Sequence, residues 1–246
     1  MFGRFKKLHF VGIGGAGMSG IAEILHNLGY HITGSDCVPS DVTRYLENLG
    51  MRVSPEHDAA NLEDVDVVVI SSAVDDDNPE IVEAAARGIP VIKRAEMLGE
   101  LMRLKFSVGV AGTHGKTTTT SMIGKILVQA GLRPTLIVGG VVAELGTGAS
   151  LGEGDYLVAE ADEYDRSILA MFPGVAVVLN IEPDHLDCYD GIDDLRDSFL
   201  AYINRVPFYG SAIVSADDPN VAQLLPRITR PYKTFGNSET ADYRAL

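Results

Sequence analysis

Short runs of apolar residues alternate with longer amphipathic stretches along the chain. The run Leu8–Val11 predicts a strand, and the near-continuous run Val65–Ile70 predicts a strand that is buried on both faces. The stretch Met18–Leu28 has helical periodicity and ends at Gly29. This alternation is typical of parallel α/β proteins. We also expect strands at His31–Thr33, Ile89–Ile92, Ser107–Ala111, Leu136–Val138, Tyr156–Ala159, Val175–Leu179 and Ala212–Ser215, and helices at Pro79–Arg87, Ala95–Leu104 and Lys116–Ala130.

The order of strand, glycine-rich turn and helix begins twice in this sequence. The first instance follows Leu8–Val11, and the second follows Ser107–Ala111 after a helical connector. Each is the usual start of an α/β unit. We therefore predict two domains, residues 1–105 and residues 106–246. The length of 246 residues agrees with this division, since domains usually contain roughly 100–200 residues.

The charge balance narrows the classes of partner. With 34 acidic and 20 basic residues the net charge is −14, which repels a nucleic-acid backbone and an anionic membrane. We expect neither as a partner, whereas small phosphorylated ligands need only one or two cations and some backbone N–H groups. Cys37 and Cys188 are far apart, as is typical of reduced thiols in a cytosolic protein. Neither a signal peptide nor a run of membrane-span length is visible, so we expect a cytoplasmic location and no membrane insertion.

Residues 12–17 read GIGGAG, which fits the pattern G-x-G-x-x-G between a predicted strand and a predicted helix. Glycine allows the backbone to approach a diphosphate closely, and the helix N-terminus supplies N–H donors. Asp36 ends the next strand and is placed to accept hydrogen bonds from a ribose. The pattern alone is typical of NAD-binding proteins. However, FAD and a nucleotide sugar contain the same diphosphate, and a tight structural turn is a further alternative.

Residues 112–118 read GTHGKTT and again follow a strand and open a helix. Lys116 is placed to contact β- and γ-phosphates, and the Thr117 hydroxyl is placed to bind Mg²⁺. The loop is a shortened form of the Walker A pattern, because Val110 stands where that pattern requires glycine. We expect His114, inside this loop, to contact the nucleotide.

Acidic residues and a histidine follow two later strands. Glu160 follows Tyr156–Ala159, and His185 lies beyond the strand Val175–Leu179. Ligands of open α/β sheets bind at such carboxyl ends, and both residue types are ordinary metal ligands. Asp162 and Glu163 extend the acidic loop after Glu160, and two interpretations stay open for them: proximity to a cation, or solvated surface charge.

The motifs together resemble those of the Mur ligases of bacterial cell-wall synthesis. The shared segments are residues 9–19 (HFVGIGGAGMS), 34–36 (GSD), 112–118 (GTHGKTT), 160–163 (EADE) and 180–185 (NIEPDH). The resemblance runs from Leu8 to about the C-terminus and is strongest to the branch of the family that adds L-alanine. It implies a Rossmann-like UDP-sugar-binding domain followed by a P-loop-type ATPase α/β domain that is truncated at its C-terminus.

The resemblance implies roles for individual residues. The first loop would bind the diphosphate of UDP-N-acetylmuramate rather than NAD, and the second would bind ATP. The residues implied at the UDP-sugar are Gly14, Gly15, Ala16, Gly17, Met18, Ser19, Asp36, Ser71, Ser72 and Ala73. The residues implied at ATP are Gly112, Thr113, His114, Gly115, Lys116, Thr117 and Thr118. Mg²⁺ would be arranged by Thr117, Glu160 and His185, and the implied catalytic residues are Lys116, Glu160 and His185.

The reaction implied by the resemblance is ATP-dependent amide formation. The carboxylate of UDP-N-acetylmuramate attacks the γ-phosphate of ATP, and the amine of L-alanine then displaces phosphate from the acyl phosphate. Two anions must approach each other in the first step, so Lys116 and Mg²⁺ are expected to screen their charges.

Two features depart from the family pattern. Several relatives carry a carbamylated lysine downstream, but the chain has no lysine from Asp184 to Val206, and Phe199 lies near the corresponding place. We therefore expect no carbamate. Family members also carry a third domain without a counterpart here, so we interpret the chain as a fragment that retains UDP-sugar binding better than turnover. The alternatives are another ligase of the group, from the murein-peptide-recycling or folylpolyglutamate branch, and a non-catalytic nucleotide- or NAD-binding module.

Overall fold

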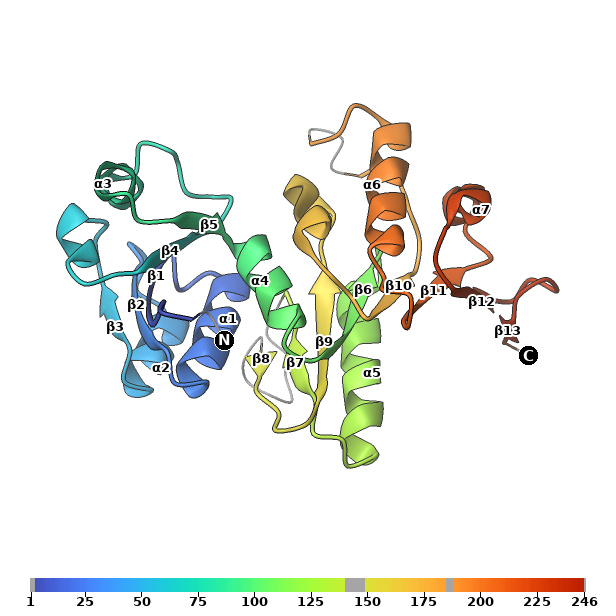
Figure 1. Cartoon of the computed structure of the whole chain (residues 1–246), viewed down its shortest axis with the longest axis horizontal. Helices are drawn as coiled ribbons and strands as arrows, with labels where there is room; N and C mark the ends of the chain where they lie inside the picture. The colour runs from blue at the N-terminus through green and yellow to red at the C-terminus, as the bar shows by residue number, and fades with distance from the viewer. Residues whose placement is uncertain (1–2, 140–148, 185–187, 246) are drawn as a thin grey trace. The chain divides into compact units, whose positions relative to one another are not determined.

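The computed structural model describes residues 3–139, 149–184 and 188–245. It confirms the predicted α/β class, with two parallel sheets and the helices that pack on them (Figure 1). The chain divides into two compact units. The first consists of Met1–Met97 and Gly139–Leu151, and the second of Leu98–Val138 and Gly152–Leu246.

The first unit contains a parallel sheet with the strand order β3-β2-β1-β4-β5, which is a Rossmann-like arrangement. Its strands are β1 (Lys7–Val11), β2 (His31–Ser35), β3 (Arg52–Ser54), β4 (Val67–Ile70) and β5 (Val91–Lys93). Its helices are α1 (Ala16–Asn27), α2 (Asp41–Asn48), the 3-10 helix η1 (Ala59–Leu62) and α3 (Pro79–Arg87). Helix α4 (Arg94–Met102) continues into the second unit, and the short strand β8 (Ala149–Ser150) is counted with the first.

Burial explains why these segments form this sheet. Leu8 and Phe10 of β1 and Val68 of the neighbouring β4 are almost completely inaccessible to solvent, as expected for parallel strands covered on both faces. The helical periodicity places Ile21, Leu25 and Leu28 on one face; helix α1 buries Ile21 and Leu25, whereas Leu28 follows its end and is exposed.

The second unit contains a parallel sheet with the order β13-β12-β11-β10-β6-β9-β7. Its strands are β6 (Phe106–Ala111), β7 (Thr135–Ile137), β9 (Tyr156–Ala161), β10 (Val175–Val178), β11 (Ser211–Ser215), β12 (Tyr232–Gly236) and β13 (Tyr243–Arg244). Its helices are α5 (Lys116–Gln129), α6 (Ile192–Asn204), α7 (Pro219–Leu224) and the 3-10 helices η2 (Tyr164–Ala170) and η3 (Leu225–Arg227).

Strand β6 lies between β9 and β10, and this position governs where the second glycine loop lies. Val110, Val158 and Val177 of these three strands form one buried cluster, against which Ile123 and Leu127 of α5 pack. Because the strands are parallel, their carboxyl ends meet at the same edge of the sheet. The loops that follow β6, β9 and β10 therefore converge.

Helix α3 has the predicted bounds, and local chemistry explains both ends. The Asn78 side chain accepts a hydrogen bond from the N–H of Glu80, and Pro79 occupies the first helical position. Gly88 ends the helix with a φ of 66°, a left-handed conformation that favours glycine.

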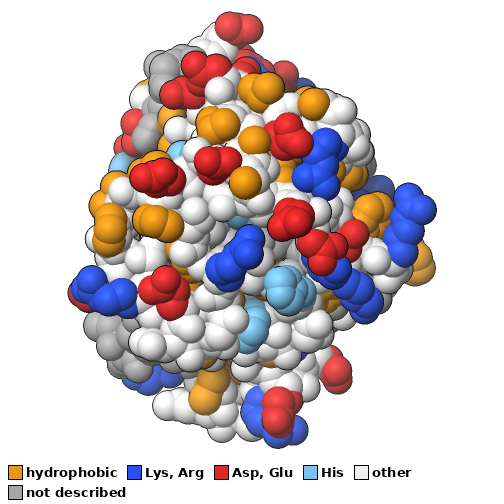
Figure 2. All heavy atoms as spheres, turned by 90° about the vertical axis from the view of Figure 1, so that its left-hand side faces the viewer, with side chains coloured by type: hydrophobic (Ala, Val, Ile, Leu, Met, Phe, Trp, Pro, Cys, Tyr) orange, Lys and Arg blue, Asp and Glu red, His pale blue; other side chains and the backbone are white. Residues whose placement is uncertain are grey.

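Charged groups of both signs occupy the surface shown in Figure 2, where acidic and basic side chains are interspersed. In the described part of the chain, no helix has both the length and the apolar character needed to cross a membrane.

Candidate functional site

The loop between β1 and α1 carries the first predicted phosphate motif. The N–H groups of Gly12 and Ile13 donate to the carbonyl oxygen of Ser35 at 2.8 and 3.1 Å. The N–H of Gly14 donates to Asp36 Oδ2 at 2.8 Å. The carboxyl end of β2 therefore holds the glycine loop in place.

Asp36 has a role that the sequence did not predict. Its Oδ2 accepts from Gly14, and its Oδ1 accepts from the N–H of Val38 at 3.0 Å. A Cβ on Gly14 would lie 2.8 Å from Asp36 Oδ2, so glycine is required for this close approach. Asp36 thus anchors the loop, and its contact with a ribose stays a prediction.

The turn after β4 also lies beside the first loop. A Cβ on Gly12 would lie 3.8 Å from Ser71 Oγ, and this hydroxyl accepts a hydrogen bond from the N–H of Ala73 at 3.3 Å. Ser72 and Ala73 are exposed. The structure therefore brings the predicted residues of this turn next to the predicted diphosphate loop.

The remaining predicted residues of the first loop form the start of α1. Ala16 is the first residue of this helix, and the N–H groups of Met18 and Ser19 donate to the carbonyl oxygen of Gly15 at 2.9 and 3.0 Å. Met18 is only 1% exposed, so its side chain packs in the core.

Arg94 is a candidate residue that the sequence reasoning missed. A Cβ on Gly17 would lie 3.0 Å from Arg94 Nη1, so a guanidinium lies beside the predicted diphosphate loop within the first unit. Its position two residues beyond the predicted strand Ile89–Ile92 was the available signal, because ligands gather at the carboxyl ends of such strands.

The second glycine loop joins β6 to α5 and contains the predicted lysine. Gly112 and Gly115 have φ values of 146° and 85°, which favour glycine. The Lys116 ammonium donates to the carbonyl oxygen of Gly112 at 2.8 Å and to Glu163 Oε2 at 2.7 Å. Its Nζ lies 3.7 Å from Asp162 Oδ1. The structure thus brings Lys116 together with the acidic loop after β9.

The first turn of α5 has the features of an anion site. Thr117 and Thr118 are exposed, no side chain caps the helix start, and the first turn contains no acidic residue. Uncapped N–H groups and the positive end of the helix dipole favour a phosphate at such a position.

The loop after β10 is hydrogen-bonded to the second glycine loop. Asn180 Oδ1 accepts from the N–H of His114 at 2.8 Å, and Asn180 Nδ2 donates to the carbonyl oxygen of His114 at 3.0 Å. The N–H of Glu182 donates to Thr113 Oγ1 at 2.9 Å. His114 Nε2 lies 3.6 Å from Glu182 Oε2. Asn180 therefore positions the loop, a role that the sequence reasoning did not assign.

The acidic residues Glu160, Asp162 and Glu163 lie in three different environments. Glu160 lies inside β9 opposite Val110, rather than beyond the strand as predicted, because β9 extends to Ala161. Glu163 is 1% exposed, whereas the Asp162 side chain is 41% exposed. Solvated surface charge therefore describes Asp162 better than Glu163.

Two buried carboxylate oxygens have no hydrogen-bond partner among the described residues, namely Oε1 of Glu160 and Oε1 of Glu163. Isolated buried carboxylate oxygens are costly, and a hydrated Mg²⁺ would supply the charge and donors that they lack. The residues present therefore fit a divalent cation, with Thr117 as the predicted hydroxyl ligand. His185, the third predicted ligand, lies outside the described residues, and the described residues contain no cluster of three or more His, Cys, Asp or Glu side chains suited to a metal.

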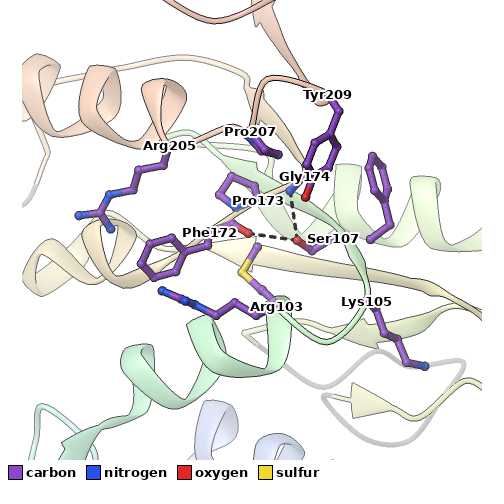
Figure 3. Close-up of a pocket in the computed structure, with 11 residues that line it drawn as sticks. Arg103, Lys105, Ser107, Phe172, Pro173, Gly174, Arg205, Pro207 and Tyr209 are labelled. Carbon is purple, nitrogen blue, oxygen red and sulfur yellow. Dashed lines mark hydrogen bonds between the residues drawn. The ribbon is translucent and has the colours of Figure 1, made fainter. Parts of the chain in front are cut away.

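A cavity of about 270 Å³ lies elsewhere in the second unit, at the amino ends of the strands (Figure 3). Ser107 at the start of β6 donates to the carbonyl oxygen of Phe172 at 3.3 Å and accepts from the N–H of Gly174 at 3.2 Å. Because the second glycine loop follows the carboxyl end of β6, this cavity is separate from the candidate nucleotide site of the second unit.

The fold and these loops define a two-unit α/β protein with one phosphate-type glycine loop in each unit. The model of the "Mur ligase family, catalytic domain" matches residues 7–106, and the model of the "Mur ligase middle domain" matches residues 110–246. The chain belongs to the Mur ligase family.

Curated relatives and solved structures agree with this assignment. The UDP-N-acetylmuramate–L-alanine ligase of Pelobacter propionicus is 57% identical over 246 residues, which are 100% of this chain and 54% of the relative. The corresponding ligase of an Anaeromyxobacter species is 58% identical over 242 residues, which are 98% of this chain and 53% of the relative. The chain thus spans about half the length of the curated relatives it matches.

Two solved structures extend the comparison. A UDP-N-acetylmuramate:L-alanyl-gamma-D-glutamyl-meso-diaminopimelate ligase from Neisseria meningitides superposes with a TM-score of 0.86 at 30% identity, over 96% of this chain and 79% of that one. The UDP-N-acetylmuramate-alanine ligase of Thermotoga maritima superposes with a TM-score of 0.82 at 31% identity, over 96% of this chain and 53% of that one.

Proposed function

We propose that this chain supplies the UDP-sugar-binding domain, residues 1–105, and the ATP-binding domain, residues 106–246, of a ligase that joins L-alanine to UDP-N-acetylmuramate. The observation that carries the proposal is Lys116, which lies at the uncapped start of α5 beside the buried carboxylate of Glu163 in the loop after β9. The 57% identity to a UDP-N-acetylmuramate–L-alanine ligase supports L-alanine as the amino acid. Such a reaction uses cytoplasmic substrates, so we propose that location.

In the proposed reaction, a carboxylate oxygen of UDP-N-acetylmuramate attacks the γ-phosphorus of ATP and ADP leaves. The amine of L-alanine then attacks the acyl carbon, phosphate leaves, and the amine loses a proton. A carboxylate reacts poorly with an amine until its oxygen becomes part of a leaving group. Lys116 would neutralise phosphate charge during the first step, and the N–H groups at the start of α5 would hold the phosphates.

Thr117, Glu160 and His185 are the residues that we propose to hold Mg²⁺. The bound cation would screen the negative charges of ATP and the attacking carboxylate. The unpartnered Oε1 of Glu160 supports this assignment among the described residues. Gly14, Asp36, Ser71 and Arg94 would surround the UDP diphosphate or its ribose in the first unit.

A second candidate function is ligation of a murein peptide to the same UDP-sugar. The similarity to the Neisseria meningitides ligase, with a TM-score of 0.86, favours it as the alternative. Mass spectrometry of the product distinguishes the two reactions, because L-alanine and a tripeptide give different masses.

Titration of the chain with UDP-N-acetylmuramate and with NADH tests the proposed first site. We expect calorimetric heat and a rise in melting temperature with UDP-N-acetylmuramate but not with NADH. Preference for NADH would favour a nucleotide-binding module of another kind and would overturn the proposal.

A further inference from the structure

The phosphate-loop lysine is already engaged by a carboxylate in the structure. Lys116 Nζ lies 2.7 Å from Glu163 Oε2, and the exposed fractions of the two side chains are 16% and 2%. We propose that Glu163 is a positioning residue that holds Lys116 away from the phosphates of metal-free nucleotide and thereby makes nucleotide binding depend on Mg²⁺. The inference rests on the proposed ATP site.

The position of Glu163 is fixed by contacts on its own backbone. The Tyr189 hydroxyl donates to the carbonyl oxygen of Glu163. The Arg166 guanidinium lies over the Tyr189 ring, 4.8 Å from its centroid, and pairs with both carboxylate oxygens of Asp194 in α6. Contacts through Arg166 and Tyr189 therefore connect α6 to Glu163, the partner of Lys116.

The backbone after Glu163 is also strained. Asp165 and Arg166 have φ values of 52° and 56°. This left-handed conformation is unfavourable for residues other than glycine. Such strain persists only where surrounding contacts enforce it. Here the pair of Arg166 with Asp194 is one such contact, so the segment that presents Glu163 is held in a defined conformation.

Electrostatics explains why this pair would discriminate between nucleotide forms. When an ammonium contacts a buried carboxylate, the negative charge of the carboxylate cancels most of the electrostatic attraction between the ammonium and an incoming phosphate. If Lys116 turned toward a metal-free nucleotide, Glu163 would remain buried and unpaired next to further negative charge, which is strongly unfavourable. A nucleotide that carries Mg²⁺ brings a second cation close to Glu163. Lys116 can then turn toward the phosphates without leaving the Glu163 carboxylate buried and unpaired.

The neighbouring acidic residue provides a matched comparison. Asp162 Oδ1 is 3.7 Å from Lys116 Nζ, and its side chain is 41% exposed. Water screens an exposed carboxylate at this distance, so its hold on the lysine is weak. Replacement of either residue by its amide removes one negative charge, but only replacement of Glu163 removes the buried ion pair with Lys116.

The test is calorimetric titration of ADP into the whole chain, once in EDTA and once in excess Mg²⁺, for wild type, Glu163→Gln and Asp162→Asn. The readout is a ratio, the dissociation constant of ADP in EDTA divided by its dissociation constant in Mg²⁺. We expect Glu163→Gln to bind metal-free ADP about tenfold more tightly than wild type, with a smaller change in Mg²⁺, so the ratio falls. Asp162→Asn should keep a ratio closer to that of wild type.

If the ratio in Glu163→Gln equals the wild-type ratio, the inference about Glu163 is wrong. The proposed ATP site still stands in that case, because ADP binding itself supports it. Absence of ADP binding by the wild-type chain in both conditions overturns the proposed ATP site and the inference with it. Should Glu163→Gln fail to fold, Tyr189→Phe carries the test, since it removes the hydroxyl that fixes the Glu163 backbone. A wild-type ratio in Tyr189→Phe would then overturn the inference, and a lowered ratio would support it.

Discussion

The side-chain amide of Asn180 forms two hydrogen bonds to the backbone of His114, accepting from its N–H at 2.8 Å and donating to its carbonyl oxygen at 3.0 Å. A loop at the end of β10 thereby fixes the conformation of the second glycine loop, at the end of β6. A phosphate loop binds well only when its N–H groups are already oriented, so this pair affects ligand affinity as well as stability.

Asn180→Ala tests the effect of this pair. We expect a loss of about 1 kcal/mol in the free energy of unfolding, because two partly exposed hydrogen bonds are removed, together with a clear loss of Mg·ADP affinity. Urea unfolding and calorimetry measure the two effects. Asn48→Ala, at an exposed position at the end of α2, is the control. Equal ADP affinity in Asn180→Ala and wild type would contradict the proposed effect on the loop.

Gly14→Ala tests the close approach at the first loop. Its Cβ would lie 2.8 Å from Asp36 Oδ2 and 3.0 Å from Thr43 Cγ2, so we expect loss of UDP-N-acetylmuramate binding. The control is Gly50→Ala, where φ is 97° and no atom lies within 4 Å of the added Cβ. Both variants should lose about 1 kcal/mol of stability or more, but only Gly14→Ala should lose the ligand. Unchanged binding in Gly14→Ala would refute this role of the loop.

A buried carboxylate in the first unit predicts a pH dependence of stability. Glu80 is 0% exposed and accepts hydrogen bonds from Asn61 at 2.6 Å, Ser35 at 2.6 Å, and His9 and His57 at 3.1 Å each. Burial acts to raise the pKa of Glu80, but hydrogen bonds from His9, Ser35 and Asn61 outweigh it and hold the pKa below its ordinary value of 4.5.

Glu80→Gln should therefore reduce stability most clearly at neutral pH. A lowered folded-state pKa means that Glu80 contributes stability above its unfolded pKa, and that this contribution is lost as the pH falls through the folded pKa. We expect a loss of about 2–3 kcal/mol at pH 7, and a difference from wild type that shrinks in acid. Urea unfolding across this range measures it, with the more exposed Glu83→Gln as control. A constant difference at every pH would argue against the ionised carboxylate as the cause.

Gly109→Ala and Tyr202→Phe test packing under the second sheet. A Cβ on Gly109 would overlap the Tyr202 hydroxyl, which is buried and has no hydrogen-bond partner among the described residues. We expect Gly109→Ala to cost about 2 kcal/mol and Tyr202→Phe to be neutral or stabilising. The double variant should recover about 1 kcal/mol or more relative to additivity. Strictly additive effects in thermal unfolding would show that the contact is not the cause.

The sequence predicts the elements whose local signals agree with their burial. Helix α3 is predicted with its bounds because Asn78, Pro79 and Gly88 mark its ends, and Leu8–Val11 is predicted because the strand is apolar and buried. The edge strand β3 was not predicted, since Arg52–Ser54 is short and only partly buried. Its pairing with β2 is a tertiary relationship that no local pattern reports.

The residues of the candidate site also divide into those that the sequence predicts and those that only the fold brings together. The glycines and Lys116 are recognisable because the proposed phosphate binding requires them in a local order. The contact of Lys116 with Glu163 joins residues 47 positions apart, and the clamp of Asn180 on His114 joins residues 66 positions apart. Glu163 was indistinguishable from its solvated neighbour Asp162 until the fold buried one and exposed the other.

The central claim is that the two glycine loops bind different nucleotides, a UDP-sugar in the first unit and Mg·ADP or Mg·ATP in the second. Crossed calorimetric titrations of wild type, Gly14→Ala and Lys116→Ala test it most directly. We predict that Gly14→Ala loses UDP-N-acetylmuramate binding and keeps Mg·ADP binding, and that Lys116→Ala does the reverse. Loss of both ligands in either folded variant, or loss of the same ligand in both variants, would contradict the account.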